Sequence, residues 1–287
     1  MKTLDFLFGP GATMQPAALA AVAVALLCGL LSPLVVLKRM AFIGQGVSHA
    51  AFGGIGVAAV LGLFSVGAAG SGTPLGAMAV IAAFCVGAAL VIGHLSSKTG
   101  VSEDTAIGVL LVASMALGFL LLQVYRSRPG GSTISVESVL FGDVATTGPT
   151  QAIAAWCVLL GSAAAIVVAR RPLLFWAFDE PMAESLGVRV GAVRAMLMVI
   201  LAVAIVVTMQ LAGVILATAM LVLPGAAALQ LSNRLGRVVL LSVALGLAGA
   251  AIGLVVSFET DWQPGPNIAM VYIAIFVLAR LFRAIRG

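Results

Sequence analysis

The sequence predicts an all-α protein that crosses a membrane eight or nine times. Hydrophobic residues make up 62% of the 287-residue chain and charged residues 9%, and the mean hydropathy is +1.21. A soluble domain carries about 25% charged residues, so this composition indicates a membrane protein. Apolar stretches recur along the whole chain, each close to the roughly 20 residues that a membrane-spanning helix needs. No soluble segment exceeds about 30 residues, which is too short to fold a separate catalytic domain.

The apolar stretches define nine candidate spans. They are residues 14–37, 48–66, 76–97, 105–124, 151–169, 195–213, 214–232, 238–256 and 267–284. The apolar run 193–232 fits two spans with a tight turn near 210–213, or one span with a re-entrant half-helix. Pro224 and Gly225 lie inside the seventh span, where we expect a kink and a candidate gating element.

The basic residues predict the orientation, because cytoplasmic loops of membrane proteins are enriched in Lys and Arg. An external N-terminus and a cytoplasmic C-terminus leave only Lys2, Arg126 and Arg128 outside and place every other Lys and Arg inside. The pI of about 9.6 then reflects topology and not nucleic-acid binding. Anionic lipid headgroups are the expected partner of this basic rim.

A polar patch lies between two long apolar stretches. Gln45 and His49 are four residues apart, so they share one face of a helix. A histidine at membrane depth is costly and usually faces a bundle interior or a water-filled path. The alternative is a core histidine that stabilises a helix kink among glycines. We expect the adjacent Ser48 to bond a backbone carbonyl of the preceding turn, and we include it with Gln45 and His49 as candidate path residues.

Small residues follow the same segment at every fourth position. Gly46, Ala50, Gly54 and Ala58 form a stripe that allows close helix approach, either in a dimer contact or in an internal packing face. We expect all three cysteines, Cys28, Cys85 and Cys157, to be small buried packing residues.

Three further polar residues lie near the predicted span ends. His94, at the end of the third span, is expected to be structural. Glu103 and Asp104 precede the next helix. There they either cap its N-terminus or form a cytoplasmic exit site for an ion.

The longest cytoplasmic loop, about residues 170–194, predicts a short amphipathic helix. Asp179 suits an N-cap, Pro181 the first turn and Gly187 the C-terminal stop. Glu180 and Glu184 favour the positive N-terminal half of this helix. Its apolar stripe recurs every four residues and comprises Phe178, Met182 and Leu186. Such a helix either lies on lipid or docks in a groove on a partner protein, and its acidic face favours docking.

Sequence motifs for ATP binding and common hydrolytic chemistry are missing from the chain. It has no phosphate-binding loop, no H-E-x-x-H helix and no nucleophile elbow in the expected context. The chain therefore reads as a non-enzyme that binds no cofactor. Either it is a gradient-driven carrier, or a separate polypeptide supplies the energy. The carboxylates all fall in loops or at span ends, which argues against proton coupling.

Three segments resemble the membrane subunit of a bacterial ABC importer of the zinc/manganese/iron type. They are RMAFIGQGVSHAAFGG at 39–54, FDEPMAESLGV at 178–188 and GVILATAMLVLPGAAA at 213–228, with shorter similarities at 103–108 and 140–143. The resemblance implies one permease domain, 1–287, in the bacterial plasma membrane. It also implies a partner permease subunit in a homodimer, two ATPase subunits that bind ATP, and an extracellular metal-binding protein.

The resemblance also implies roles for the two segments described above. Residues 179–187, including Ala183, would be the coupling helix that sits in the ATPase. The family often carries Asp where this chain has Gln45, whereas the histidine matches His49. Two neutral side chains would bind a divalent ion weakly, which suits a transit point. The transported metal would be Mn or Zn, or alternatively Fe.

Three other functions remain open. An ABC permease for a metal chelate would need a wider and more polar path. A secondary metal carrier acting alone would take up metal without an ATPase and would carry carboxylates within its spans. A non-transporting membrane scaffold would keep its function when His49 is replaced by alanine.

Overall fold

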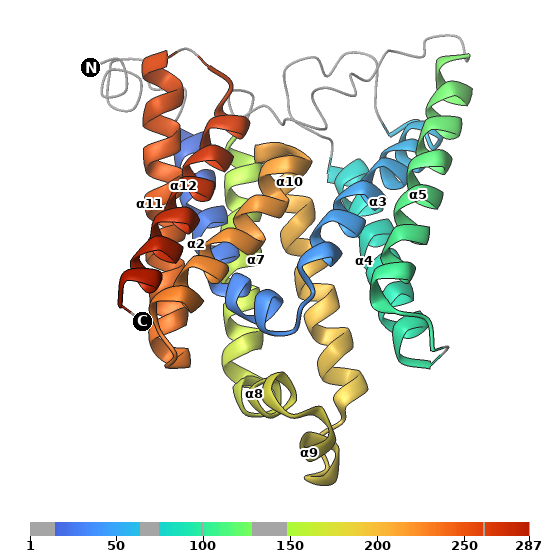
Figure 1. Ribbon diagram of the computed structural model, residues 1–287. Coiled ribbons are helices and arrows are strands. Elements are labelled where there is room, and N and C mark those ends of the chain that lie inside the picture. The colour runs from blue at the N-terminus through green and yellow to red at the C-terminus, as the bar shows by residue number, and fades with distance from the viewer. Residues whose placement is uncertain (1–14, 64–74, 99, 128–147, 261, 287) are drawn as a thin grey trace. The chain divides into compact units, whose positions relative to one another are not determined.

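The computed structural model describes residues 15–63, 75–98, 100–127, 148–260 and 262–286, and within them every regular element is an α-helix (Figure 1). The helices are α2 (Gln15–Leu37), α3 (Ala41–Val60), α4 (Leu75–Lys98), α5 (Glu103–Arg126), α7 (Pro149–Val168), α8 (Arg170–Phe178), α9 (Glu180–Ser185), α10 (Val190–Leu231), α11 (Leu235–Thr260) and α12 (Pro264–Arg286). Eight of these described helices are long and apolar enough to cross a membrane. The predicted all-α membrane fold is therefore confirmed, whereas its orientation stays a prediction.

Helix α10 covers the ambiguous apolar run and is divided within it. Its 42 residues would form a rod of about 63 Å, twice the roughly 30 Å thickness of the hydrocarbon core. The helix is broken at Gly213, whose backbone angles of φ 74° and ψ 170° are essentially restricted to glycine. The break lies at the predicted boundary between the sixth and seventh spans. The two segments that it leaves, 190–212 and 214–231, are each about long enough for one span.

The second span begins earlier than predicted. Helix α3 starts at Ala41 and not at residue 48, so Gln45 lies within the same helix as His49, as their spacing predicts. The reason is that its glycines and alanines are buried in a close helix packing that tolerates isolated polar side chains.

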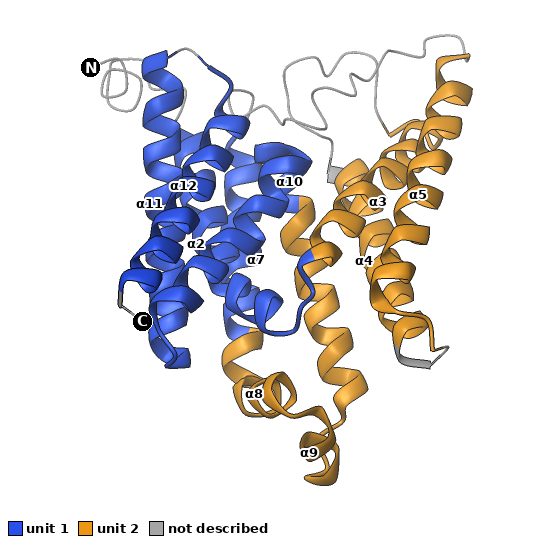
Figure 2. Ribbon diagram, viewed as in Figure 1, with its two compact units in different colours: residues 1–41, 137–164, 207–287 blue, residues 42–136, 165–206 orange. Residues whose placement is uncertain are grey.

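The chain forms two compact units, each assembled from separate stretches of sequence (Figure 2). Unit 1 comprises residues 1–41, 137–164 and 207–287, and unit 2 comprises residues 42–136 and 165–206. Each unit is described by itself below. The expectation of a single permease domain stays a prediction.

In unit 1, small residues of α11 allow α2 and α12 to pack closely against it. A methyl group on Gly29 of α2 would lie 2.8 Å from the Cα of Val243. The Ser242 hydroxyl donates a hydrogen bond of 2.7 Å to the carbonyl oxygen of Gly29. On the α12 side, the Tyr272 ring packs on Gly249, and its hydroxyl donates to the carbonyl of Gly246. Close backbone approach is therefore what holds this helix trio together.

Pro224 and Gly225 mark a helix contact and not the break in α10. The Ser32 hydroxyl of α2 accepts a hydrogen bond from the backbone N–H of Gly225 at 2.8 Å and donates to the carbonyl of Val222 at 3.1 Å. This hydroxyl supplements the backbone hydrogen bonding that the proline weakens, and the non-helical angles of α10 occur at Gly213 instead. A kink at Pro224 and Gly225 stays a prediction. A gating role for Pro224 and Gly225 stays a prediction.

In unit 2, the small-residue stripe of α3 is an internal packing face. Gly46, Ala50, Gly54 and Ala58 are all buried. A methyl group on Gly46 would lie 2.8 Å from Cγ2 of Ile107 in α5. These contacts favour the internal alternative over a dimer contact.

The cysteine prediction was correct for two of the three residues. Cys28 and Cys85 are buried free thiols, but Cys157 is exposed on α7. The reason is that α7 buries only a narrow stripe of four residues, namely Ala152, Ala155, Leu159 and Ser162. Cys157 lies off that stripe.

Candidate functional site

The polar patch of α3 combines an exposed amide with buried polar atoms. Gln45 is exposed and His49 is half-buried, one helical turn apart on the same face. The His49 Nδ1 atom is buried, and no hydrogen-bond partner for it exists among the described residues. The same holds for the Ser48 hydroxyl, so its expected bond to the preceding turn was wrong. Buried polar atoms are usually satisfied, so each of these two atoms is available to bond a water molecule or an ion.

The donors that this patch offers are neutral. They are an amide oxygen, an imidazole nitrogen and a hydroxyl oxygen. Within the described part of the chain, no group of three or more His, Cys, Asp or Glu side chains could hold a metal. The patch can therefore contribute a few ligands to a passing hydrated cation, and it lacks the carboxylates of a tight metal site.

The predicted amphipathic helix is present as α9, and its ends are fixed as expected. The Asp179 side chain accepts a hydrogen bond of 3.0 Å from the backbone N–H of Met182. At the other end, Gly187 has φ 79° and its N–H bonds the carbonyl of Glu184, while the Val188 N–H bonds that of Ala183. This pair of bonds is the Schellman arrangement that stops a helix at a glycine. The sequence signals for α9 are therefore confirmed.

The apolar stripe of this segment points away from the protein. Phe178, Met182 and Leu186 are each more than half exposed, whereas Ala183 on the opposite face is buried. We name Phe178, Met182 and Leu186 the docking stripe. The docking stripe runs from the last residue of α8 through α9 to the C-cap of α9. Exposed apolar side chains gathered in this way are typical of a contact surface for a partner.

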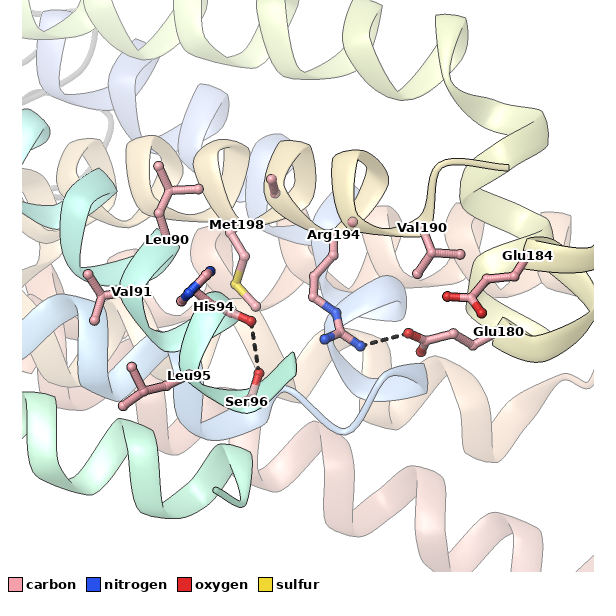
Figure 3. Close-up of a pocket in the computed structure, with 13 residues that line it drawn as sticks. Leu90, Val91, His94, Leu95, Ser96, Glu180, Glu184, Val190, Arg194 and Met198 are labelled. Carbon is pink, nitrogen blue, oxygen red and sulfur yellow. Dashed lines mark hydrogen bonds and ion pairs between the residues drawn. The ribbon is translucent and has the colours of Figure 1, made fainter. Parts of the chain in front are cut away.

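Beside α9, unit 2 contains a cavity of about 960 Å³ whose walls come from α4, α9 and α10 (Figure 3). Its polar lining residues are His94, Ser96, Glu180, Glu184 and Arg194. Nη2 of Arg194 lies 2.7 Å from Oε1 of Glu180, and this ion pair joins α10 to α9. In Figure 3 the Glu184 carboxylate lies next to that of Glu180 on the same helix.

Sequence reasoning did not identify this arrangement. Arg194 and His94 both line the cavity, and the structural role expected for His94 stays a prediction. One sequence pattern could have predicted the ion pair: Glu180 and Glu184 are one helical turn apart, and an arginine follows in the next helix.

Glu103 and Asp104 occupy the first turn of α5. The N-cap is Ser102, whose hydroxyl accepts from the backbone N–H of Thr105 at 3.2 Å. The two carboxylates therefore do not cap the helix themselves, although their charge is favourable at its N-terminus. Their role as an exit site stays a prediction, and the segment 140–143 lies outside the described residues.

Comparisons with known proteins identify the family of the chain. The profile of the ABC 3 transport family matches residues 11–283. The manganese transport system membrane protein MntC of Halalkalibacterium halodurans is 33% identical over 96% of this chain and 88% of its own length. A probable iron transport system membrane protein of Haemophilus influenzae is 31% identical over 95% of this chain and 94% of its own length.

A solved structure is similar over nearly the whole chain. PsaBC from Streptococcus pneumoniae in complex with Fab superposes with a TM-score of 0.81 at 25% identity, covering 99% of this chain and 98% of that one. The profile match at residues 11–283 includes the segments that carry the polar patch, the docking stripe and the broken helix. The chain belongs to the ABC 3 transport family and is a multi-pass protein of the bacterial plasma membrane.

Proposed function

We propose that this chain forms the membrane path of an ATP-driven importer for a divalent transition metal ion, with manganese as the first substrate. The observation that carries the proposal is the buried Nδ1 atom of His49, which has no hydrogen-bond partner among the described residues. A polar atom left unsatisfied inside a membrane helix costs free energy that a passing ion or its water can recover. The chain belongs to a transport family, which supports the interpretation that this atom lines a transport path.

The choice of metal rests on the relatives and on the donor atoms together. The Halalkalibacterium halodurans relative is named for manganese and the Haemophilus influenzae relative for iron. Manganese favours oxygen ligands such as the amide of Gln45, whereas imidazole suits iron and zinc as well. We therefore propose manganese as the first candidate substrate and iron as the second, and the names of these two relatives support this order.

The lack of a carboxylate at this patch fits a transit point. Gln45 and His49 bring no negative charge to offset the loss of an ion's hydration shell. An ion that must leave as readily as it enters is served by weak ligation at several positions. We infer that the ion keeps part of its water shell as it passes α3.

The docking stripe provides the proposed link to ATP. The stripe runs along the end of α8, α9 and its C-cap, and its exposed apolar side chains are available for a soluble ATPase subunit to bury. The proposed assembly contains two copies of this chain, two ATPase subunits and an extracellular metal-binding protein. The docking segment then faces the cytoplasm, in agreement with the distribution of basic residues.

Reconstitution tests this function. Proteoliposomes that contain the chain with its ATPase, and with its metal-binding protein on the external side, should accumulate radioactive manganese only when ATP is present. His49→Ala should reduce uptake strongly while the complex still assembles. Gln123→Ala is the control, because Gln123 is an exposed polar residue of α5 that belongs neither to the polar patch nor to the cavity lining. Equal uptake with and without ATP would instead indicate a secondary carrier.

A further inference from the structure

Helix α9 depends on its neighbours for its position. It has six residues, whereas isolated helices shorter than about 12 residues are marginal in water. Its caps fix its ends, and buried Ala183 fixes its inner face. Movement of the docking stripe is therefore transmitted to the membrane spans through the contacts between α9 and its neighbouring helices.

The ion pair between Glu180 and Arg194 is one such contact, because it joins α9 to α10. The two side chains are separated by 14 residues in sequence, and they are 34% and 23% exposed. Partial burial shields the pair from solvent, so it holds its geometry better than a fully exposed pair. Charge-assisted bonds of this kind are also the strong ones among protein hydrogen bonds.

A second carboxylate lies within the same cavity. Glu184 lines the wall one turn beyond Glu180, and in Figure 3 both carboxylates lie on the Arg194 side of α9. The cavity of about 960 Å³ leaves room for the guanidinium group to change partner. A shift of α9 along its axis by one turn, about 5.4 Å, would exchange Glu180 for Glu184 without leaving Arg194 unpaired.

The contact continues from Arg194 towards the polar patch. Met198, one turn further along α10, is buried, and a methyl group on Gly93 of α4 would lie 3.6 Å from its Cγ. On α4, Cδ1 of the adjacent Ile92 lies 3.7 Å from a methyl group placed on Gly46 of α3. Gly46 is one turn before His49. Close-packed contacts inside unit 2 thus connect α9 with the candidate path.

We propose that Arg194 is a positioning residue that transmits movement of the ATPase-docked helix α9 into α10 through its ion pair with Glu180. The proposal rests on the proposed function, since it presumes that an ATPase moves α9. Loss of the ion pair then uncouples ATP hydrolysis from transport, so hydrolysis continues while the metal transported per ATP falls. If Arg194 only stabilises the fold, its loss should lower ATP hydrolysis, metal transport and the amount of folded complex together.

A charge exchange tests the proposal in the reconstituted complex. The variants are Arg194→Glu, Glu180→Arg and the double exchange, and Arg189→Glu is the control because Arg189 is an exposed arginine of the same loop. The readouts are ATP hydrolysis, manganese uptake and co-purification of the ATPase subunit. We expect each single exchange to lower manganese transported per ATP by about tenfold, the size of an ordinary coupling interaction. The double exchange should restore most of that ratio.

The outcomes separate this proposal from the proposed function. Wild-type complex that takes up no metal overturns both. If the wild-type complex takes up manganese and Arg194→Glu transports as much manganese per ATP as wild type, only the proposed role of Arg194 is overturned. The same holds if the double exchange transports no more manganese per ATP than the single exchanges. Loss of ATPase co-purification in Arg194→Glu also overturns it, because Arg194 would then serve assembly. Arg194→Lys, which keeps the charge, should retain most of the transport per ATP.

Discussion

Truncation of Leu186 should weaken the complex with the ATPase by a calculable amount. The Leu186 side chain is 57% exposed in the free subunit. Full burial of a leucine stabilises by about 1.5–3 kcal/mol, so the exposed part can contribute about 1–1.7 kcal/mol when a partner covers it. Leu186→Ala should therefore raise the Kd for the ATPase about 5- to 20-fold.

The assay is a titration of labelled ATPase subunit against the permease in lipid nanodiscs. Leu160→Ala is the matched control, because Leu160 is a leucine of α7 with a similar exposure of 64% but lies within a predicted span. Lipid covers that side chain in the membrane, so its truncation should leave the Kd unchanged. Equal Kd values for Leu186→Ala and wild type, with both proteins folded, would refute docking through this stripe. Equal weakening in both variants would instead trace the effect to general destabilisation.

Three further substitutions follow from the geometry. Gln45→Asp adds a negative charge beside His49, so manganese should bind more tightly and leave more slowly. The uptake rate at saturating manganese should therefore fall. Unchanged manganese binding would contradict ligation at this position. Gly225→Ala places a methyl group 2.6 Å from the backbone carbon of Ser32, and the clash should cost about 1–3 kcal/mol and lower the unfolding temperature in detergent. Gly213→Ala forces an alanine into φ 74° at a similar cost of about 1–3 kcal/mol. Gly161→Ala is the control for both, because a methyl group there meets nothing within 4 Å; an equal loss of stability in the control would contradict both arguments.

Local signals were sufficient to predict α9 and the division of α10. Asp179 and Gly187 act through hydrogen bonds to residues three or four positions away, so their spacing in the sequence carries the information. The break at Gly213 was accessible for a similar reason, since an apolar run of that length must be interrupted within a membrane. Glycine is the residue that allows the interruption.

Contacts between distant segments could not be read from the sequence. The bond between Ser32 and the N–H of Gly225 joins residues 193 positions apart, and the pair of Arg194 with Glu180 requires two helices to meet at one cavity. The start of the second span was predicted too late because hydropathy treats the polar residue Gln45 as a break in a span. In the structure, burial of the small residues around it keeps the helix continuous.

The most direct test of the central claim asks whether the transported ion passes His49. In the reconstituted complex with Cys157→Ser, the variant His49→Cys would be treated with a small cationic thiol reagent, and manganese uptake would be measured afterwards. Cys157 is removed because it is the exposed thiol of the three, whereas Cys28 and Cys85 are buried. The account predicts that the reagent blocks the uptake that His49→Cys retains, and that excess manganese slows the block. Uptake that is unaffected by a reagent shown to have modified the introduced thiol would contradict a path beside this residue.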